Sequence, residues 1–138
     1  FPFITQVASG SLKELQIFGN NWETKDGTCI RDYIHVMDLA DGHISTFEYL
    51  LENEAQFINL NIGTGRGTSV LELVKAFEIA NKIKIPFKFS NRRKGDKCIS
   101  LANNSLAISL LNWEPKRNLE QMCKDGWRWE MYKSKLIE

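Results

Sequence analysis

The segment 56–72 most limits the folds open to this chain, because it passes from strand to turn to helix within a few residues. Apolar residues in 56–62 are partly consecutive and partly alternating, which predicts a β-strand that is buried on both faces. The glycines in 63–67 predict a tight turn, and Ser69 with Glu72 predicts a capping box at the start of a helix. Strands and helices interleave elsewhere as well, and the sequence therefore predicts an α/β fold.

The glycine turn 63–67 is comparable with a dinucleotide-binding fingerprint, since it too follows a predicted strand and opens a helix. Its spacing, however, is G-x-G-x-G rather than G-x-G-x-x-G. About 20 residues further on, where an acidic residue would contact a ribose, the sequence Asn-Lys-Ile-Lys occupies positions 81–84. We therefore interpret the glycines as a tight turn with close helix–strand packing, and we assign no cofactor-binding residue to this chain.

The rest of the pattern divides the chain into short elements. Helices are predicted at 2–9, from 37 onward, at 104–111 and at 118–134, and strands at 15–18 and 85–89, with 30–36 extended or irregular. Asn118 is a suitable N-cap for the last helix, and Pro86 indicates an edge strand. The helix from residue 37 carries an apolar face formed by Leu39, Ala40, His43, Ile44, Phe47, Leu50 and Leu51.

The composition is that of an ordinary globular protein, with 43% apolar and 25% charged residues among 138. This length suits one domain with a substantial core. The net charge of +1 gives no electrostatic case for a nucleic-acid or membrane partner, and no apolar run reaches the roughly 18 residues that would span a bilayer. The three cysteines match neither a disulfide framework nor a zinc site. We therefore expect a cytoplasmic protein.

Arg31 and Tyr33 follow a polar loop and directly precede a predicted helix. The guanidinium group of an arginine suits a phosphate, because its planar fork donates two parallel hydrogen bonds. A tyrosine offers an apolar face to a ring and a polar tip. This segment therefore indicates a loop that binds an anion and leads into a helix.

A second candidate for anion binding is the basic loop 92–96, in which three cations stand beside a glycine. Arg93 and its neighbours would hold a phosphate, and Asp96 would accept hydrogen bonds from ribose hydroxyls. The sequence alone is equally compatible with a solvated basic loop.

The histidines and nearby aspartates do not form a recognisable metal site. His35 and His43 are eight positions apart, and no pair has a ligand spacing such as H-x-x-x-H. We interpret these residues as core or capping groups. No Ser/His/Asp or Cys/His arrangement is present in the sequence either, so we assign no catalytic residue.

The run from Asp26 to His43 and the loop from Arg93 to Asp96 closely resemble the matching segments of the UDP-glucose 4-epimerases, a family of extended short-chain dehydrogenases/reductases. The resemblance extends from Phe1 to about Trp129 and corresponds to roughly the last two-fifths of such an enzyme. It implies the following substrate-binding residues: Gln16, Ile17 and Phe18 along the uracil, Arg31 at the diphosphate, Arg93 and Asp96 at the UDP moiety, and Tyr33 and Ser100.

The resemblance also implies what lies outside this chain. The chain starts without Met and in the middle of a helical pattern, so we expect residues 1–138 to be the C-terminal, UDP-sugar-binding portion of a longer epimerase. An N-terminal Rossmann domain would hold NAD and supply a catalytic Tyr-x-x-x-Lys pair. None of Tyr33, Tyr49 and Tyr132 has Lys four positions later, so we expect the fragment alone to be inactive.

The implied parent interconverts UDP-glucose and UDP-galactose through a transient 4-keto sugar, with a UDP-hexose as its substrate and a homodimer as its assembly. Two alternatives remain: a nucleotide-sugar-binding module without chemistry, and a related NDP-sugar dehydratase.

Ser100 matches a position that lines the hexose site in the epimerase family. A large residue there restricts the family to glucose and galactose, whereas a small one leaves room for an N-acetyl group. Because Ser is small, the resemblance implies that the parent also accepts N-acetylated UDP-sugars. The alternative is that Ser100 merely continues the loop edge.

Overall fold

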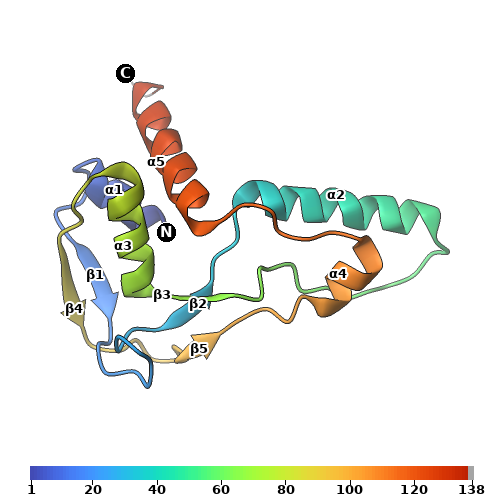
Figure 1. Ribbon diagram of the computed structural model, residues 1–138, viewed down its shortest axis with the longest axis horizontal. Coiled ribbons are helices and arrows are strands. Elements are labelled where there is room, and N and C mark those ends of the chain that lie inside the picture. The colour runs from blue at the N-terminus through green and yellow to red at the C-terminus, as the bar shows by residue number, and fades with distance from the viewer. Residues whose placement is uncertain (137–138) are drawn as a thin grey trace.

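The computed structural model describes residues 1–136 and has an α/β architecture, as predicted (Figure 1). Its elements in chain order are α1 (Pro2–Ala8), β1 (Leu15–Phe18), β2 (Ile30–Asp32), α2 (Val36–Glu52), β3 (Gly67–Ser69), α3 (Val70–Asn81), β4 (Phe87–Ser90), β5 (Ile99–Ser100), α4 (Ser105–Leu111) and α5 (Leu119–Lys135). Within residues 1–136, no helix is long and apolar enough to span a membrane.

Two small sheets organise the chain. Strands β1 and β4 pair in parallel, with Leu15 opposite Phe87 and Phe18 opposite Ser90. The second sheet has the order β3-β2-β5, in which β2 is antiparallel to β3 and parallel to β5. Figure 1 shows α1, α3 and α5 gathered at the end that carries β1 and β4, whereas α2 and α4 occupy the opposite end.

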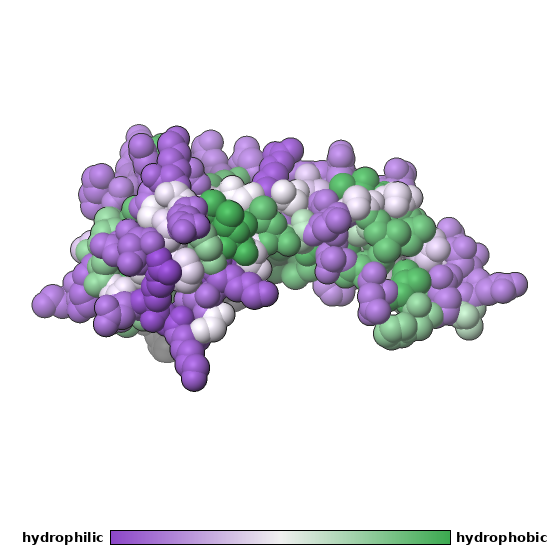
Figure 2. All heavy atoms as spheres, turned by 90° about the horizontal axis from the view of Figure 1, so that it is seen from below, coloured by the Kyte–Doolittle hydropathy of each residue, from purple (hydrophilic) through white to green (hydrophobic). Residues whose placement is uncertain are grey.

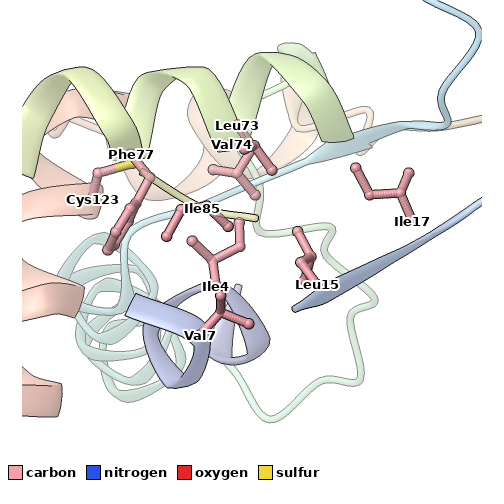
Figure 3. Close-up of a cluster of buried hydrophobic side chains, with 9 residues drawn as sticks. All are labelled: Ile4, Val7, Leu15, Ile17, Leu73, Val74, Phe77, Ile85 and Cys123. Carbon is pink, nitrogen blue, oxygen red and sulfur yellow. The ribbon is translucent and has the colours of Figure 1, made fainter. Parts of the chain in front are cut away.

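The main core lies where α1, α3 and α5 meet the first sheet (Figure 3). Phe77 of α3 is its central side chain and is fully buried, with aromatic edge contacts to Phe1 and Trp127. The buried members are Ile4, Val7, Leu15, Ile17, Leu73, Val74, Phe77, Ile85 and Cys123. A second, smaller cluster at the other end consists of Ala107, Leu111 and Trp113.

The local signals for helix starts are confirmed. The amide of Glu72 donates to Oγ of Ser69 at 3.0 Å, and the amide of Ser69 donates to Oε2 of Glu72 at 2.8 Å, which completes the capping box of α3. Oδ1 of Asn118 accepts from the amide of Gln121 at 2.9 Å and caps α5. These side chains satisfy amides that the first helical turn leaves without backbone partners.

The predicted strand at 56–62 is wrong. The segment is irregular, and Phe57 is 87% exposed. An apolar pattern becomes a strand only where a neighbouring strand can bond to it, and no described strand pairs with this segment. Leu60 and Ile62 instead pack against the cluster around Trp113.

The short strands β3 and β5 were not predicted, and β4 begins two residues later than expected. Pro86 has no amide to donate, and only its carbonyl takes part, by accepting from the amide of Leu15 at 2.8 Å. Strands of two or three residues are too short to leave a periodic signal, so only their pairing with β2 defines them.

The predicted apolar face of α2 is real but largely uncovered. Phe47 is 63% and Leu51 is 70% exposed, whereas the buried residues of this helix are Asp38 and Gly42. Figure 2 shows apolar surface towards the end of the molecule that carries α2 and α4. The helix therefore packs against the rest of the chain through the narrow side that carries Asp38 and Gly42. Its wide apolar side, which includes Phe47 and Leu51, is exposed to solvent.

Candidate nucleotide-binding site

A cavity of about 250 Å³ lies between α1, β1, β2, α3 and the loop after β4. Seven of the eight residues predicted to bind substrate line it: Gln16, Ile17, Phe18, Arg31, Tyr33, Arg93 and Asp96. The eighth, Ser100, does not. It is exposed on β5, opposite Arg31 in the strand register.

Strand pairing explains why these distant residues meet. Because β1 and β4 are parallel and in register, both strands end at the same edge, with Phe18 opposite Ser90. The loop that carries Arg93 therefore starts beside the end of β1. In the second sheet, β2 places Arg31 next to β5, which follows the same loop.

Two arginines share one carboxylate at the mouth of this cavity. Nε of Arg93 donates to Oδ2 of Asp96 at 3.0 Å, and Nη2 of Arg93 donates to Oδ1 at 3.3 Å. Nη2 of Arg31 lies 3.9 Å from Oδ1 of the same carboxylate. The trio has a net charge of +1, which suits an incoming anion.

The backbone fixes the Arg31 guanidinium group. Nη1 donates to the carbonyl of Ile30 at 2.8 Å and to that of Cys98 at 3.4 Å. These bonds orient Nη2 towards Asp96 and keep the side chain only 27% exposed. A held guanidinium loses less conformational entropy when it binds a ligand.

Aromatic side chains form the apolar part of the site. The guanidinium carbon of Arg93 lies 4.5 Å from the centre of the Phe18 ring, a cation–π contact. Tyr33 packs against the main core, and its burial raises the pKa of its phenol, although the nearby Arg31 opposes that rise. The phenol is therefore neutral near pH 7 and can donate a hydrogen bond.

The residues of β1 contribute in different ways. Ile17 is 1% exposed and belongs to the core, so its side chain is not available to a ligand. Gln16 is exposed, and Phe18 is half-buried. The amides of Leu15 and Gly19 donate to carbonyls of the β4 segment. Alternate residues of a strand direct their backbone groups to opposite edges, which leaves the backbone groups of Gln16 and Phe18 on the edge away from β4.

The glycine turn does not fit NAD. The carboxylate of Asp32 already accepts from the amides of Thr64 and Gly65, at 3.0 and 2.9 Å, where a phosphate would bind. A Cβ at Gly63 would lie 2.5 Å from that of Ala102. The predicted role of the glycines in close packing is confirmed. The role of Asp32 as acceptor for this turn was not predicted from the sequence, because it depends on a contact with a residue 32 positions away.

The other histidine and aspartate candidates have structural partners. Nδ1 of His35 accepts from the amide of Met37 at 3.1 Å and caps α2, and its Nε2 lies 3.1 Å from Oδ2 of Asp125. Asp38 accepts from the amide of Arg117 at 2.9 Å and pairs with its guanidinium group. Within residues 1–136, no group of three acidic, histidine or cysteine side chains is arranged to hold a metal ion.

The fold and this geometry place the chain in a known family. The family model described as GDP-mannose 4,6 dehydratase matches residues 1–126, and the chain belongs to that family. Among curated relatives, the UDP-glucose 4-epimerases of Bacillus subtilis (strain 168) and Pasteurella multocida (strain Pm70) are 50% and 51% identical over 129 residues. The aligned region covers 94% of this chain but only 38% of each relative's length.

Solved structures agree with this assignment. The UDP-glucose-4-epimerase from Stenotrophomonas maltophila, with bound NAD and formylated UDP-arabinopyranose, matches with a TM-score of 0.93 and 44% identity over 98% of this chain and 40% of its own. The enzyme from Bifidobacterium longum, in complex with NAD⁺ and UDP, matches with a TM-score of 0.90 and 38% identity over 96% of this chain and 39% of its own. The resemblance to UDP-glucose 4-epimerases is thus confirmed.

Proposed function

We propose that this chain is the part of a UDP-glucose 4-epimerase that binds the UDP moiety of the substrate. The observation that carries the proposal is the pair of arginines around Asp96, next to an aromatic ring and the edge of β1 that faces away from β4, in one cavity. A nucleoside diphosphate has the matching parts, namely a planar base, two ribose hydroxyls and two adjacent phosphates.

Each group of the site has a role in this proposal. Arg31 and Arg93 bind the diphosphate, since guanidinium groups form short, charge-assisted hydrogen bonds to phosphate oxygens. Asp96 releases Arg93 and accepts from the ribose hydroxyls. Phe18 covers the uracil, and the backbone edge of Gln16 and Phe18 pairs with the polar edge of the base. Remote binding of this kind positions the hexose for reaction elsewhere.

The parent uses NAD, as the solved relatives suggest, but the glycine turn 63–67 does not fit that cofactor, because Asp32 already accepts from its amides. We assign NAD and the chemistry at the sugar to a part of the parent outside residues 1–138. The wide apolar side of α2 and the irregular segment 56–62 supply the surface on which that domain packs, because a large exposed apolar patch marks an interaction surface.

The experiment that tests this function uses the complete parent protein. Titration calorimetry with UDP is expected to show a single site, and incubation with UDP-galactose is expected to yield UDP-glucose. Binding without conversion, with NAD shown to be present, would favour a binding module. A dehydrated 4-keto product would favour a dehydratase, and absence of UDP binding would refute the assignment of the cavity.

Ser100 provides a second test within the same function. We propose that it borders the hexose and leaves room for an N-acetyl group. Ser100→Tyr is then expected to abolish conversion of UDP-N-acetylglucosamine while it preserves that of UDP-glucose. If the parent does not convert the acetylated sugar, or if the variant converts it as well as the parent does, Ser100 does not limit the sugar.

A further inference from the structure

A group of three residues beside the nucleotide-binding cavity joins two loops that are far apart in the sequence. The guanidinium carbon of Arg92 lies 3.9 Å from the centre of the Trp22 ring. Nε of Arg92 donates to Oδ1 of Asn21 at 2.8 Å, and its Nη2 donates to the carbonyl of Asn21. We call Asn21, Trp22 and Arg92 the tryptophan clamp. None of the three lines the cavity.

The clamp is anchored to the end of β1. Nε1 of Trp22 donates to the carbonyl of Phe18 at 3.3 Å. Gly19 makes the necessary tight turn with a φ of +85°, and a Cβ there would lie 2.4 Å from Nε1 of Trp22 and 2.9 Å from Cγ of Arg92. The indole, the turn and the arginine stem are therefore packed too closely for any other residue at position 19.

The clamp acts on the site through the chain itself, because Arg92 directly precedes Arg93. Arg92 is held against Trp22 and Asn21, whereas Arg93 contacts Phe18 and Asp96. Anchoring Arg92 therefore fixes the peptide from which Arg93 extends.

We propose that the tryptophan clamp is a positioning device that holds the loop 91–97 in its binding conformation before the nucleotide arrives. This inference rests on the proposed UDP-binding function and deepens it. The charge of Arg92 is engaged by Trp22 and Asn21, and Arg92 does not line the cavity in which the diphosphate is proposed to bind. A loop that is already in place removes part of the ordering cost of binding, and the apparent affinity falls in proportion to the fraction of loops in the competent conformation.

The test compares two variants of the complete parent protein that each remove one positive charge from the same loop. Arg92→Ala breaks the clamp. Lys94→Ala is the matched control, since Lys94 is exposed, does not line the cavity, and has no hydrogen bond or ion pair within residues 1–136. Calorimetry is expected to show about tenfold weaker UDP binding for Arg92→Ala, or about 1.4 kcal/mol, and less than about twofold for Lys94→Ala. Equal weakening would mean that Arg92 acts only through its charge, and would overturn the proposal.

Two further readouts separate positioning from a general loss of structure. The KM for the UDP-sugar is expected to rise in Arg92→Ala while kcat stays within about twofold, as for a loss of uniform binding.

Trp22→Ala and the double variant complete a cycle in which the two losses of UDP affinity should not add, because the residues are in contact. Arg92→Lys is expected to recover part of the affinity, since Lys keeps the cation over the ring but not the bonds to Asn21. Additive losses would contradict the clamp.

A measurement without nucleotide makes the inference independent of UDP. Hydrogen exchange of the amides in 91–97 is expected to be faster in Arg92→Ala than in the parent and unchanged in Lys94→Ala. If the parent fails to bind UDP, the proposed function fails, and the exchange data still decide whether the clamp orders the loop. Unchanged exchange in Arg92→Ala would refute the clamp even if UDP binding is intact.

Discussion

At the scale of single residues, Arg31, Arg93 and Asp96 hold one another in the described structure. Each arginine already has a carboxylate partner, so a diphosphate must compete with Asp96 for Arg93. Arg31 has the weaker link to that carboxylate, at 3.9 Å, and its backbone bonds leave Nη2 directed at the site. We therefore expect Arg31 to provide the larger share of the diphosphate affinity.

The first prediction concerns Arg31. Arg31→Ala removes a charge-assisted pair worth about 1.5–3 kcal/mol, so UDP binding by the complete parent should weaken roughly 10- to 150-fold. Arg66→Ala is the control, because Arg66 is an exposed arginine that does not line this cavity. Titration calorimetry measures both affinities for UDP. An unchanged affinity in Arg31→Ala would show that Arg31 does not bind the diphosphate.

The second prediction concerns acid stability. Burial would raise the pKa of Asp38, but hydrogen bonds from the backbone and side chain of Arg117 outweigh it and hold the pKa below its ordinary value. A carboxyl with a lowered folded-state pKa stabilises the fold above its unfolded pKa of about 3.9, and this contribution is lost as the pH falls through the folded value. The free energy of unfolding of the parent should therefore fall with acid below about pH 4.

Asp38→Asn is the matched variant for this prediction. It should lower the free energy of unfolding at pH 7 and reduce the loss between pH 5 and pH 2, because the titrating group has gone. Urea unfolding followed by circular dichroism at several pH values measures both quantities. Parallel pH profiles for parent and variant would show that the bond between Asp38 and Arg117 does not couple protonation to folding.

At the scale of elements, the sequence predicted best what depends on neighbouring residues. Strand β1 has the bounds expected from its pattern, and the caps of α3 and α5 use Ser69 and Asn118 as expected. Strands β3 and β5 escaped prediction, because pairing with β2 defines them. The strand predicted at 56–62 was wrong for the opposite reason. Its sequence pattern is that of a strand, but no described strand offers an edge for pairing.

The candidate site also combines features that neighbouring residues predict with features that depend on distant contacts. The residues alone indicated an anion-binding segment at Arg31 and left 92–96 open, and only the family resemblance connected β1 with a base. Neither source indicated that Trp22 contacts Arg92, since the two residues meet only after β1 and β4 have paired.

The third prediction tests the start of α3. Ser69→Ala removes an N-cap, which costs about 0.5–2 kcal/mol, and it also removes a hydrogen bond from Ser69 Oγ to Asp26. Asn118→Ala removes the cap of α5 alone, and Asn118 lies nearer the surface. Chemical denaturation should therefore show a larger loss of stability for Ser69→Ala. A smaller loss than for Asn118→Ala would show that the bond to Asp26 contributes little.

At the scale of the whole molecule, the two ends differ in how completely they are packed. The end with α1, α3 and α5 surrounds a closed core, whereas the end with α2 leaves a wide apolar side in contact with solvent. Such a surface favours association between copies of the chain. The parent would cover it, in our proposal, with the domain that holds NAD.

The fourth prediction is that residues 1–138 produced alone associate in solution. Phe47→Glu together with Leu51→Glu should reduce this association, because two charges then interrupt the exposed apolar side of α2. Replacement of the exposed acidic Glu48 by Gln is the control on the same helix. Sedimentation velocity measures the outcome, and a monomeric fragment at all concentrations would contradict the prediction.

Parallel pairing between distant strands has a consequence for how the proposed binding site forms during folding. Asn21 and Arg92 are 71 positions apart, and the contact between Arg31 and the Cys98 carbonyl spans 67. Contacts of such high sequence separation close long loops and form slowly during folding. The proposed nucleotide site therefore exists only in the finished topology, and recovery of UDP affinity by the complete parent during refolding should trail the appearance of helical signal.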